Sequence, residues 1–466
     1  MSTFCRFVGI LFCVALPRLA LAQTGEIVIT TCDYATVAPA LAAVTEGGTL
    51  TLDCEGTVEV PAGKPLAIST SIGVRSTSEH GVVFSAASNT RVLVVNANVG
   101  FQLANATFLG GKGLGGGLSN QGGQVTLFRV KFISLSGVTD EAGGAIYNGN
   151  GGTLSINGSQ LSDNSSFGGG GAIYNAADSS VMLSEVNFSG NRSYGDSGGG
   201  AIYNNGALVV DRSSFTENDA QGRFGWGGAI YNTGAGQLTV TNSTFAGNTA
   251  THSGAALRND GTAQAEINFS TFVGNRVGVW GGAVYLEGGV LRVSNSLFSE
   301  NAANGIANDC QQLATISALT ISDNLSDGGC GEVAPTGLLP LADSGSPSAA
   351  YGLSEDSNAI DAASECPAAA VDQVGTVRPQ GGACDIGAVE YIAPVASDLN
   401  ACQVTTTRQL RLRAEANTSS AILAVVPHNS TFVATQSLPG WYQVTYGTVE
   451  GWLSADFVTA SGGCGE

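Results

Sequence analysis

Apolar and polar residues alternate along the middle of the chain, and the alternation recurs at a fixed interval. The motif Gly-Gly-Ala-Ile-Tyr-Asn begins at Gly143, Gly170, Gly199 and Gly227, and weaker copies precede and follow these four. Each copy leads into two aliphatic residues at alternate positions, a large apolar residue and, in most copies, an Asn. Alternation with a period of two is typical of strands, and a repeat of about 27 residues is typical of a solenoid. The pattern therefore predicts an all-β parallel β-helix with three short strands per coil.

Equivalent positions in successive copies indicate which side chains face the core. The Ile position is aliphatic in every copy, so we expect it to face the interior as one column: Leu118, Ile146, Ile173, Ile202, Ile230, Leu257 and Val284. The next position is mostly aromatic: Ser119, Tyr147, Tyr174, Tyr203, Tyr231, Arg258 and Tyr285. Strand neighbours point to opposite sides, and this second column accepts Ser and Arg, so we expect it to face solvent.

The Asn residues of the repeat form two further columns. One ends the Gly-Gly-Ala-Ile-Tyr-Asn motif, as Asn175 does, and the other follows the large apolar residue, as Asn191 does. We expect both columns to turn inward at corners, where stacked amides bond to one another and to the turn backbone.

The start of the chain has the features of a secretory signal peptide over residues 1–22. Arg6 supplies a positive charge, residues 7–16 an apolar core, and residues 20–22 a small-residue cleavage site. We therefore expect a secreted or cell-surface protein, with a permanent signal anchor as the alternative. No later segment approaches the roughly 18 uninterrupted apolar residues of a transmembrane helix, so none is predicted.

Charge limits the classes of partner. The net charge is −19, and only 12% of the residues are charged. A chain this acidic is unsuited to nucleic acid and to an anionic membrane surface. We expect a monomer that binds a polysaccharide, a cell-wall component or a surface protein.

The cysteines beyond the signal peptide lie outside the repeats and fall in pairs that are close in sequence. This placement favours disulfides in regions that lack the strand ladder of the solenoid, although eight Cys permit many pairings. The pairs that proximity favours are Cys32–Cys54, Cys310–Cys330, Cys366–Cys384 and Cys402–Cys464. No CxxC or Cys/His pair is present, so we expect no zinc site.

The paired repeats resemble those of chlamydial polymorphic outer-membrane proteins. The resemblance covers about residues 101–301 and rests on pairs such as Gly171-Ala172-Ile173 with Phe188-Ser189-Gly190-Asn191. In that family the repeats form a β-helical adhesin carried by a C-terminal membrane barrel. No such barrel follows here, so the resemblance implies adhesion without implying autotransport.

Residues 358–391 resemble the end of the choice-of-anchor Q family of secreted right-handed β-helix proteins. The matching stretches are Asn358-Ala359-Ile360-Asp361, Asp372-Gln373-Val374-Gly375 and Arg378-Pro379-Gln380 onward to Glu390-Tyr391. The resemblance implies a surface-sorted β-helix and no particular chemistry. We expect Asp361, Asp372 and Asp385 to pair with Arg378 and cap the last coil. A calcium site from the same carboxylates is the alternative.

The last part of the chain is similar to a bacterial SH3 domain. The similarity covers about residues 402–464 and rests on the pairs Gly440-Trp441 and Gly451-Trp452. It implies a small β-barrel that binds cell-wall or peptide ligands, although the family's loop motif is replaced here by Arg411-Leu412-Arg413-Ala414-Glu415-Ala416.

These features divide the chain into five parts. The Ala-rich stretch 36–44 is predicted to be a helix that covers the open end of the first coil. The parts are a signal peptide at 1–22, a parallel β-helix with an N-terminal cap at 23–345, its choice-of-anchor Q-like C-terminal segment at 346–391, a linker at 392–400, and the SH3-like domain at 401–464. We expect the last strand of the β-helix within residues 314–322.

The corner of most variable length is the candidate binding site, because solenoids tolerate insertions where they carry function. Its residues lie between the second Asn and the next repeat: Asp140, Glu141, Phe167, Arg192, Tyr194, Asp196, Arg223, Phe224, Trp226, His252, Arg276 and Trp280. Aromatic side chains among mixed charges suit sugar or protein recognition. The alternative is that Trp226 and Trp280 only pack over the neighbouring coil.

We therefore predict a non-catalytic adhesion or recognition protein with no cofactor. The candidate binding residues are Tyr147, Tyr174, Tyr203, Tyr231, Arg223, Trp226, Trp280, Trp441 and Trp452. The tyrosines are either a binding strip or scaffold only. The less favoured alternative is a polysaccharide-degrading lyase or hydrolase, for which Asp196, Asp219, Arg223 and His252 are conceivable but fixed by no motif.

Overall fold

The computed structural model divides the chain into two compact units, one ending at Tyr391 and the other beginning at Ile392. It describes residues 25–87, 89–137, 143–196, 198–312, 317–322, 324–327, 329–342, 348–367, 370–393 and 397–464. The predicted signal peptide, and the candidate residues Asp140 and Glu141, lie outside the described residues.

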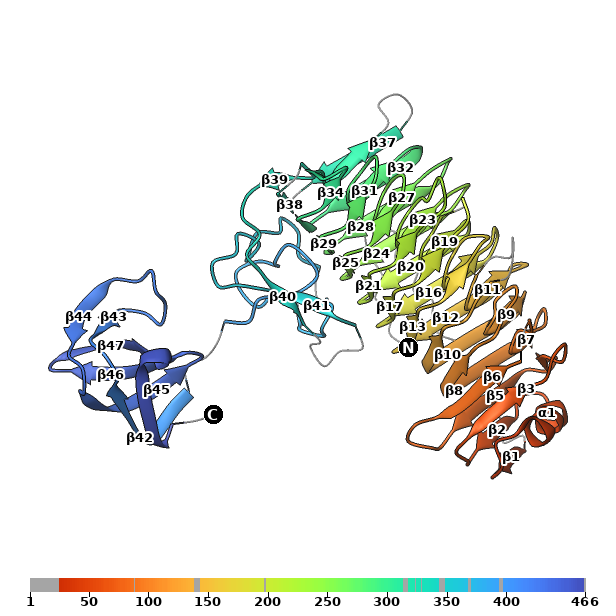
Figure 1. Ribbon diagram of the computed structural model, residues 1–466, viewed down its shortest axis with the longest axis horizontal. Helices are drawn as coiled ribbons and strands as arrows, with labels where there is room; N and C mark the ends of the chain where they lie inside the picture. The colour runs from red at the N-terminus through yellow and green to blue at the C-terminus, as the bar shows by residue number, and fades with distance from the viewer. Residues whose placement is uncertain are drawn as a thin grey trace, which may run out of the picture. The chain divides into compact units, whose positions relative to one another are not determined.

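The first unit is a parallel β-helix, right-handed as connections between parallel strands almost always are. Each strand pairs with its counterpart one coil away, so the sheets run along the stacked coils (Figure 1). Ile146, Ile173, Ile202 and Ile230 are consecutive register partners and fully buried. The predicted fold and this inward column are confirmed.

The largest sheet has two faces, which are joined within its two longest strands at residues with positive φ, Asn105 and Arg129. Its first face comprises β1 (Glu26–Ile29), β2 (Thr49–Leu52), β5 (Ile72–Ser76), β8 (Gly100–Leu109), β10 (Gln124–Ile133), β12 (Thr153–Asn157), β16 (Ser180–Ser184), β20 (Ala207–Asp211), β24 (Gln237–Thr241), β28 (Gln264–Asn268), β32 (Gly289–Ser294) and β37 (Ser317–Ser322). The second face contains the later halves of β8 and β10 with β3 (Thr57–Val60), β6 (Val82–Ala86), β13 (Gln160–Ser162), β17 (Asn187–Ser189), β21 (Ser214–Thr216), β25 (Thr244–Ala246), β29 (Thr271–Val273), β33 (Leu297–Ser299), β38 (Leu325–Ser326) and β39 (Glu332–Val333).

Two smaller sheets complete the coils. One comprises β4 (Leu66–Ile68), β7 (Leu93–Val95), β9 (Leu118–Gln121), β11 (Ile146–Gly149), β15 (Ile173–Asn175), β19 (Ile202–Asn204), β23 (Ile230–Asn232), β27 (Leu257–Asn259), β31 (Val284–Leu286) and β36 (Cys310–Gln312). The other consists of two-residue strands: β14 (Ser165–Ser166), β18 (Arg192–Ser193), β22 (Asp219–Ala220), β26 (Thr249–Ala250), β30 (Arg276–Val277), β34 (Ala302–Ala303) and β35 (Ile306–Ala307). A regular coil therefore carries one more strand than the three predicted, because these strands are too short to show alternation.

Stacked side chains fill the interior and the corners. Phe188, Phe215 and Phe245 stack with ring centroids 4.7 Å apart. The corner amides form two continuous ladders, as predicted. One ladder comprises Asn164, Asn191, Asn218, Asn248, Asn275 and Asn301, in which each Nδ2 donates to the Oδ1 of the next Asn up to Asn301. In the other, Asn120, Asn148, Asn175, Asn204, Asn232 and Asn259 do the same. All of these residues are fully buried, so the ladders satisfy polar groups that water cannot reach.

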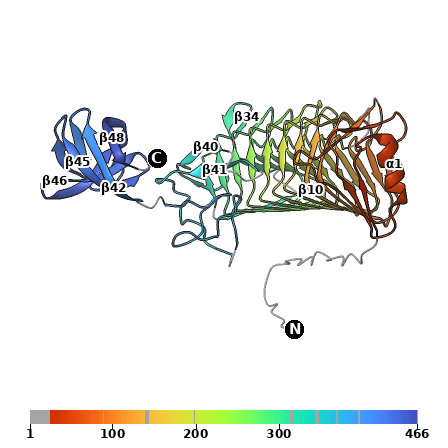
Figure 2. The ribbon, with the colours of Figure 1, turned by 90° about the horizontal axis from the view of Figure 1, so that it is seen from below.

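Helix α1 (Tyr34–Ala43) lies at the open end of the first coil, as predicted (Figure 2). Asp33 caps its N-terminus by accepting a hydrogen bond from the Thr36 amide at 2.7 Å. Val37 and Leu41 are buried in the β-helix core. The part of the chain that the structure describes contains no helix with the length and apolarity that a membrane crossing requires.

The segment after the last coils runs back along the flank of the β-helix and does not cap its end. It includes the hairpin of β40 (Leu338–Ala342) and β41 (Ala350–Leu353). Gln373 accepts a 2.6 Å hydrogen bond from Thr244 on β25, and the Ala388 amide donates to Thr271 on β29 at 2.9 Å. The prediction of a terminal cap was therefore wrong, because side chains of the second face bind this segment over several coils.

Arg378 does not pair with the three predicted Asp residues. It is fully buried and forms a 2.6 Å ion pair with Glu390, and its guanidinium lies 4.6 Å from the Phe269 ring. The Asp372 and Asp385 carboxylates instead accept backbone N–H groups. Burial raises the pKa of both Asp372 and Asp385. The alternative calcium site stays a prediction.

The second unit is a small antiparallel barrel. Its strands are β42 (Ser397–Thr406), β43 (Leu410–Arg413), β44 (Ile422–Val426), β45 (Thr431–Leu438), β46 (Trp441–Tyr446), β47 (Val449–Ser454) and β48 (Val458–Gly463), with the short helix η1 (Ala455–Phe457). Leu412, Val444 and Leu453 are fully buried in its core. Among the described residues, disulfides join Cys32–Cys54, Cys310–Cys330, Cys366–Cys384 and Cys402–Cys464, the pairs that proximity favoured.

Candidate functional site

The paired glycines of the repeat shape the corner of variable length. Gly199 has a φ of 68°, and a Cβ added there would lie 2.4 Å from the carbonyl oxygen of Ile202. A Cβ on Gly200 would lie 2.0 Å from the carbonyl oxygen of Gly228 in the next coil. Only glycine fits both positions. The motif therefore fixes how each loop enters the following Ile-Tyr-Asn strand.

Aromatic side chains from these loops gather outside the glycines. We call Phe167, Tyr194, Phe224, Trp226, His252 and Trp280 the aromatic corner. Phe167, Tyr194, Phe224 and Trp280 have exposed fractions of 51%, 40%, 40% and 42%. Trp226 and His252 are half-buried beneath them. Large exposed rings in one row mark a surface suited to binding.

The rings of the aromatic corner follow one another from coil to coil. The Phe167 and Tyr194 centroids are 5.3 Å apart. His252 lies between Phe224 and Trp280, at centroid distances of 5.9 and 4.9 Å. Asp196 joins the two groups, because its Oδ1 accepts a 3.2 Å hydrogen bond from the Phe224 amide. The row therefore extends over several coils.

The tyrosine column lies beside the aromatic corner and is less exposed than predicted. Tyr147, Tyr174 and Tyr203 are half-buried and stacked, with centroids 5.8 and 4.6 Å apart. Further along, the column is covered: Tyr231, Arg258 and Tyr285 are 5%, 4% and 2% exposed, and Ser119 is fully buried. The prediction that the column faces solvent was therefore wrong at these positions. The side chains do point away from the core, but at Tyr231, Arg258 and Tyr285 the loops of the aromatic corner lie over them.

Arg258 takes the place of a tyrosine in this column and lies inside an aromatic box. It is the register partner of Tyr231 and Tyr285. Its guanidinium carbon lies 4.4 Å from the Trp226 ring, 5.8 Å from Tyr231 and 5.5 Å from Tyr285. Trp226 is thus the nearest of the three rings. Cation–π attraction is strong for a cation removed from water in this way.

Two carboxylates neutralise Arg258. Its Nη2 lies 3.0 Å from an Asp260 oxygen and 3.0 Å from a Glu287 oxygen. Its Nη1 donates to Ser253 Oγ at 2.5 Å, while its Nε has no hydrogen-bond partner among the described residues. Tyr231 also donates to Asp260, at 3.0 Å. One buried cation thus joins side chains from three neighbouring coils.

Burial raises the pKa of several tyrosines of this region and lowers the pKa of its histidine. Burial raises the pKa of Tyr174 to about 12, with a further contribution from Tyr203 and Tyr147. The pKa of Tyr231 is raised, mainly by burial. Burial, and after it the Arg258 charge, lower the pKa of His252. The rings therefore present neutral faces around the Arg258 guanidinium, whose charge Asp260 and Glu287 offset.

Other residues predicted for the site lie apart from Arg258. Arg223 places its guanidinium 5.1 Å from the Phe224 ring, and Arg192 and Arg276 are exposed on their two-residue strands. Trp441 and Trp452 belong to the second unit, on the paired strands β46 and β47, where both are half-buried.

The residues considered for catalysis make separate contacts. Asp219 accepts hydrogen bonds from Thr249 and Gln221, Asp196 binds the Phe224 amide, and His252 packs edge-on against Trp280. Within the described ranges, no three His, Cys, Asp or Glu side chains gather in a way that could hold a metal ion.

Asp260 and Glu287 were not among the predicted site residues. Their positions in the repeat could have indicated them. Each stands two positions after the tyrosine column, so strand alternation places it on the same side as Arg258 or Tyr285. The equivalent positions of the preceding coils carry no acid.

Comparison with known proteins identifies two short regions and a likeness of fold. Residues 408–459 match the bacterial SH3 domain, and residues 185–205 match the Chlamydia polymorphic membrane protein repeat. A search of curated proteins found no match. Among solved structures, pectate lyase Pel9A is similar at 15% identity and a TM-score of 0.45, over 79% of this chain and 98% of that one. Alginate lyase from Paenibacillus sp. str. FPU-7 is similar at 13% identity and a TM-score of 0.34, over 66% and 99%.

Proposed function

We propose that this protein is an extracellular or surface-exposed recognition protein that holds a polysaccharide on the aromatic corner. The observation that carries the proposal is the row of exposed rings from Phe167 to Trp280. Flat rings suit the apolar faces of sugars, and rings that already contact one another, as Phe167 contacts Tyr194 and His252 contacts Trp280, lose less conformational entropy on binding.

The contacts of Arg258 support this role by making the row rigid. The cation binds Trp226 from beneath and is held by Asp260 and Glu287. A preorganised surface loses less free energy on binding than one that must order. The exposed guanidinium of Arg223, beside Phe224, adds hydrogen-bond donors at the edge of the row.

The rest of the chain supports a surface location in this proposal. The second unit contains the bacterial SH3 match, which fits attachment to a cell-wall component. Residues 358–391 resemble the choice-of-anchor Q family, and residues 1–22 have the pattern of a signal peptide. Together they are consistent with a secreted protein that is held at a surface and binds a glycan there.

The test is retention of the full chain on immobilised polysaccharides. The double variant Phe224→Thr/Trp280→Thr removes two exposed rings from the loops of the aromatic corner. We expect binding about ten-fold weaker or more, since each ring contact contributes roughly 0.5–1.5 kcal/mol. Val209→Thr, which removes an apolar side chain that is 39% exposed on β20, is the matched control. Equal retention by wild type and the double variant would rule out the aromatic corner as the binding surface.

A polysaccharide-degrading enzyme is the second candidate, and one observation favours it. Asp260 and Glu287 share one nitrogen of Arg258 beside Tyr231, so acids, a cation and phenols stand together at the corner. Incubation with polysaccharides, with and without calcium, distinguishes the two functions. Release of reducing ends or unsaturated sugars that is lost in Asp260→Asn would establish the enzyme, and retention without cleavage would establish the binder.

A further inference from the structure

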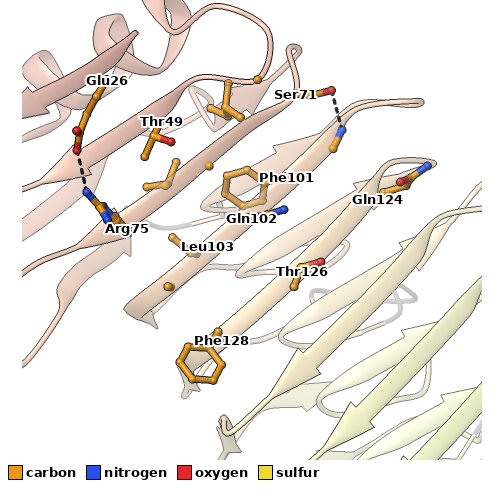
Figure 3. A pocket seen from close by; sticks show the side chains of 16 residues that line it. Glu26, Thr49, Ser71, Arg75, Phe101, Gln102, Leu103, Gln124, Thr126 and Phe128 are labelled. Atoms are coloured by element: carbon orange, nitrogen blue, oxygen red, sulfur yellow. Dashed lines mark hydrogen bonds and ion pairs between the residues drawn. The ribbon is translucent and has the colours of Figure 1, made fainter. Parts of the chain in front are cut away.

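A separate groove lies on the outer side of the largest sheet, near the N-terminal end of the β-helix. Figure 3 shows it across the first face of that sheet, over strands β2, β5, β8 and β10. Its volume is about 620 Å³, which is within the usual range of roughly 300–1,000 Å³ for ligand sites. The aromatic corner begins at Phe167 and lies at another edge of the coils, so the two surfaces are distinct.

The groove exists because small residues interrupt the outward-facing columns of the sheet. Gly73 stands between Thr49 and Gln102 in the register. Ala104 likewise stands between Arg75 and Phe128. Gly73 and Ala104 thus place little or no side chain at the centre of the groove, while the long side chains of Arg75, Gln102 and Phe128 project beside them. A Cβ on Gly73 would meet only Thr49, at 3.7 Å, so the floor of the groove is open.

The two ends of the groove differ in chemistry. At one end Arg75 and Glu26 form a 2.9 Å ion pair (Figure 3). Both side chains also form hydrogen bonds with Thr51. At the other end the Phe128 ring is 43% exposed. Arg75 and Phe128 lie on strands two positions apart, which corresponds to roughly 10 Å. This distance is comparable with the length of a short run of sugar units.

Between the ends, the groove presents uncharged hydrogen-bonding groups. Gln102, Gln124 and Thr126 are exposed along the lining, and Thr49 is half-buried beside them. Amides and hydroxyls both donate and accept, as sugar hydroxyls do. The charges of Arg75 and Glu26 offset each other, so the residues that line the groove carry no net charge, which suits an uncharged ligand. The Arg129 guanidinium lies outside the lining, 4.9 Å from the Phe128 ring, and adds hydrogen-bond donors at that end.

The pairing of the strands disfavours a peptide as occupant. A peptide that adds a strand needs a free sheet edge, but β2, β5, β8 and β10 each pair on both sides. A net charge of −19 disfavours polyanions. We propose that this groove is a second carbohydrate-binding site, which takes an uncharged oligosaccharide with one sugar face on Phe128 and hydroxyls on Gln102 and Gln124. It is independent of the function proposed for the aromatic corner.

Calorimetric titration of the full chain with glucose, N-acetylglucosamine and galacturonate oligomers tests the site. Ala104→Tyr fills the groove on an outward position, so we expect it to abolish binding of a neutral oligomer. Phe128→Thr removes the stacking face, and we expect about ten-fold weaker binding. The matched controls Ser184→Tyr and Met182→Thr lie on β16 in the same outward columns and should bind as wild type does.

The outcomes separate this groove from the aromatic corner. Loss in Ala104→Tyr together with unchanged binding in Phe224→Thr/Trp280→Thr supports the groove. Unchanged binding in Ala104→Tyr or Phe128→Thr would overturn the proposal, and so would equal loss in the controls. Binding of the galacturonate oligomer alone, or of no oligomer, would overturn it as well. Circular dichroism checks that each variant is folded. The two groove variants change different side chains, so a folding defect in one leaves the other as a test.

Discussion

The guanidinium carbon of Arg258 lies 4.4 Å from the Trp226 ring, although the two residues come from adjacent coils. A cation replaces one phenol in the tyrosine column, and two carboxylates and a tryptophan surround it. The stacked repeat thus changes from a simple aromatic ladder into a charged cluster at one place. That place lies beneath the exposed rings of the aromatic corner.

Replacing Arg258 should destabilise the β-helix. Arg258→Gln leaves Asp260 and Glu287 without their cation and removes the contact with Trp226. We expect a loss of about 2–3 kcal/mol in the free energy of unfolding, below the full cost for a buried pair because both carboxylates are partly exposed. Chemical denaturation measures it.

The control is Arg75→Gln, which breaks an ion pair whose side chains are 57% and 46% exposed. Arg75→Gln should lower the free energy of unfolding by less than about 1 kcal/mol, as the loss of an exposed ion pair usually does. Equal losses in the two variants would show that burial of Arg258 has no energetic importance.

Breaking an asparagine ladder should cost more than removing an asparagine beside it. Asn191 is fully buried, donates to the Leu161 carbonyl and to Asn218, and accepts from Asn164. In Asn191→Ala these groups lose their partners, so we expect a loss of about 2 kcal/mol or more. The half-buried Asn187 on β17 is the control, and Asn187→Ala should cost less than about 1 kcal/mol. A smaller loss for Asn191→Ala than for Asn187→Ala would contradict the importance of the ladder.

The returning segment should loosen when its buried ion pair is broken. Glu390→Gln keeps the size of the side chain but leaves the Arg378 charge buried and unpaired, which costs about 3 kcal/mol. We expect faster proteolysis and faster amide exchange after residue 348, with little change in the coils near Ile146. Glu185→Gln, which breaks the partly exposed pair with Arg212, is the control. Uniform destabilisation of the whole β-helix would contradict a separable segment.

Alkaline pH should destabilise the tyrosine column. Burial raises the pKa of Tyr174 from 10.0 to about 12 in the folded state. Between these values the folded state holds the phenol proton and the unfolded state does not, so stability is complete below pH 10 and falls as the pH rises toward 12. Tyr174→Phe should reduce this fall, as measured by unfolding at a series of pH values. An unchanged pH profile in the variant would exclude Tyr174 as the cause.

The tyrosine column should contribute more to stability than to binding. Tyr174 and Tyr203 stack at 4.6 Å and are half-buried. Tyr174→Thr/Tyr203→Thr keeps strand propensity but removes the rings, and we expect a loss of roughly 1–3 kcal/mol. Retention on polysaccharide should change less than in Phe224→Thr/Trp280→Thr. Loss of retention with unchanged stability would instead show that the tyrosine column is the binding surface.

Much of the β-helix could be predicted because its contacts are local to the repeat. Each strand pairs with the copy one period away, so equal spacing places Ile173 on Ile146 and Asn191 on Asn164. The aromatic corner followed from the same spacing, because variable loop length marks where the ladder does not constrain the chain.

The column of Ser119 and Arg258 shows where such reasoning fails. Strand alternation correctly placed both side chains outside the core, yet both are buried. The solvent exposure of an outward-facing side chain depends on which other residues cover it. At Arg258 the covering residues are those of the loops and partners such as Asp260. Amino-acid type alone does not report this.

The amino-acid sequence by itself determined the coil, its inward columns and its corner ladders, since each depends on a fixed spacing along the chain. It also indicated the disulfides, because the paired cysteines follow one another in sequence. The tertiary structure alone decided the rest. Gln373 meets Thr244 across 129 positions, and Arg378 selects Glu390 over three nearby Asp residues. The groove arises because Gly73 and Ala104 happen to lie beside Gln102 and Phe128 in register. These contacts join irregular segments through side-chain shape and burial, and no period along the chain encodes them.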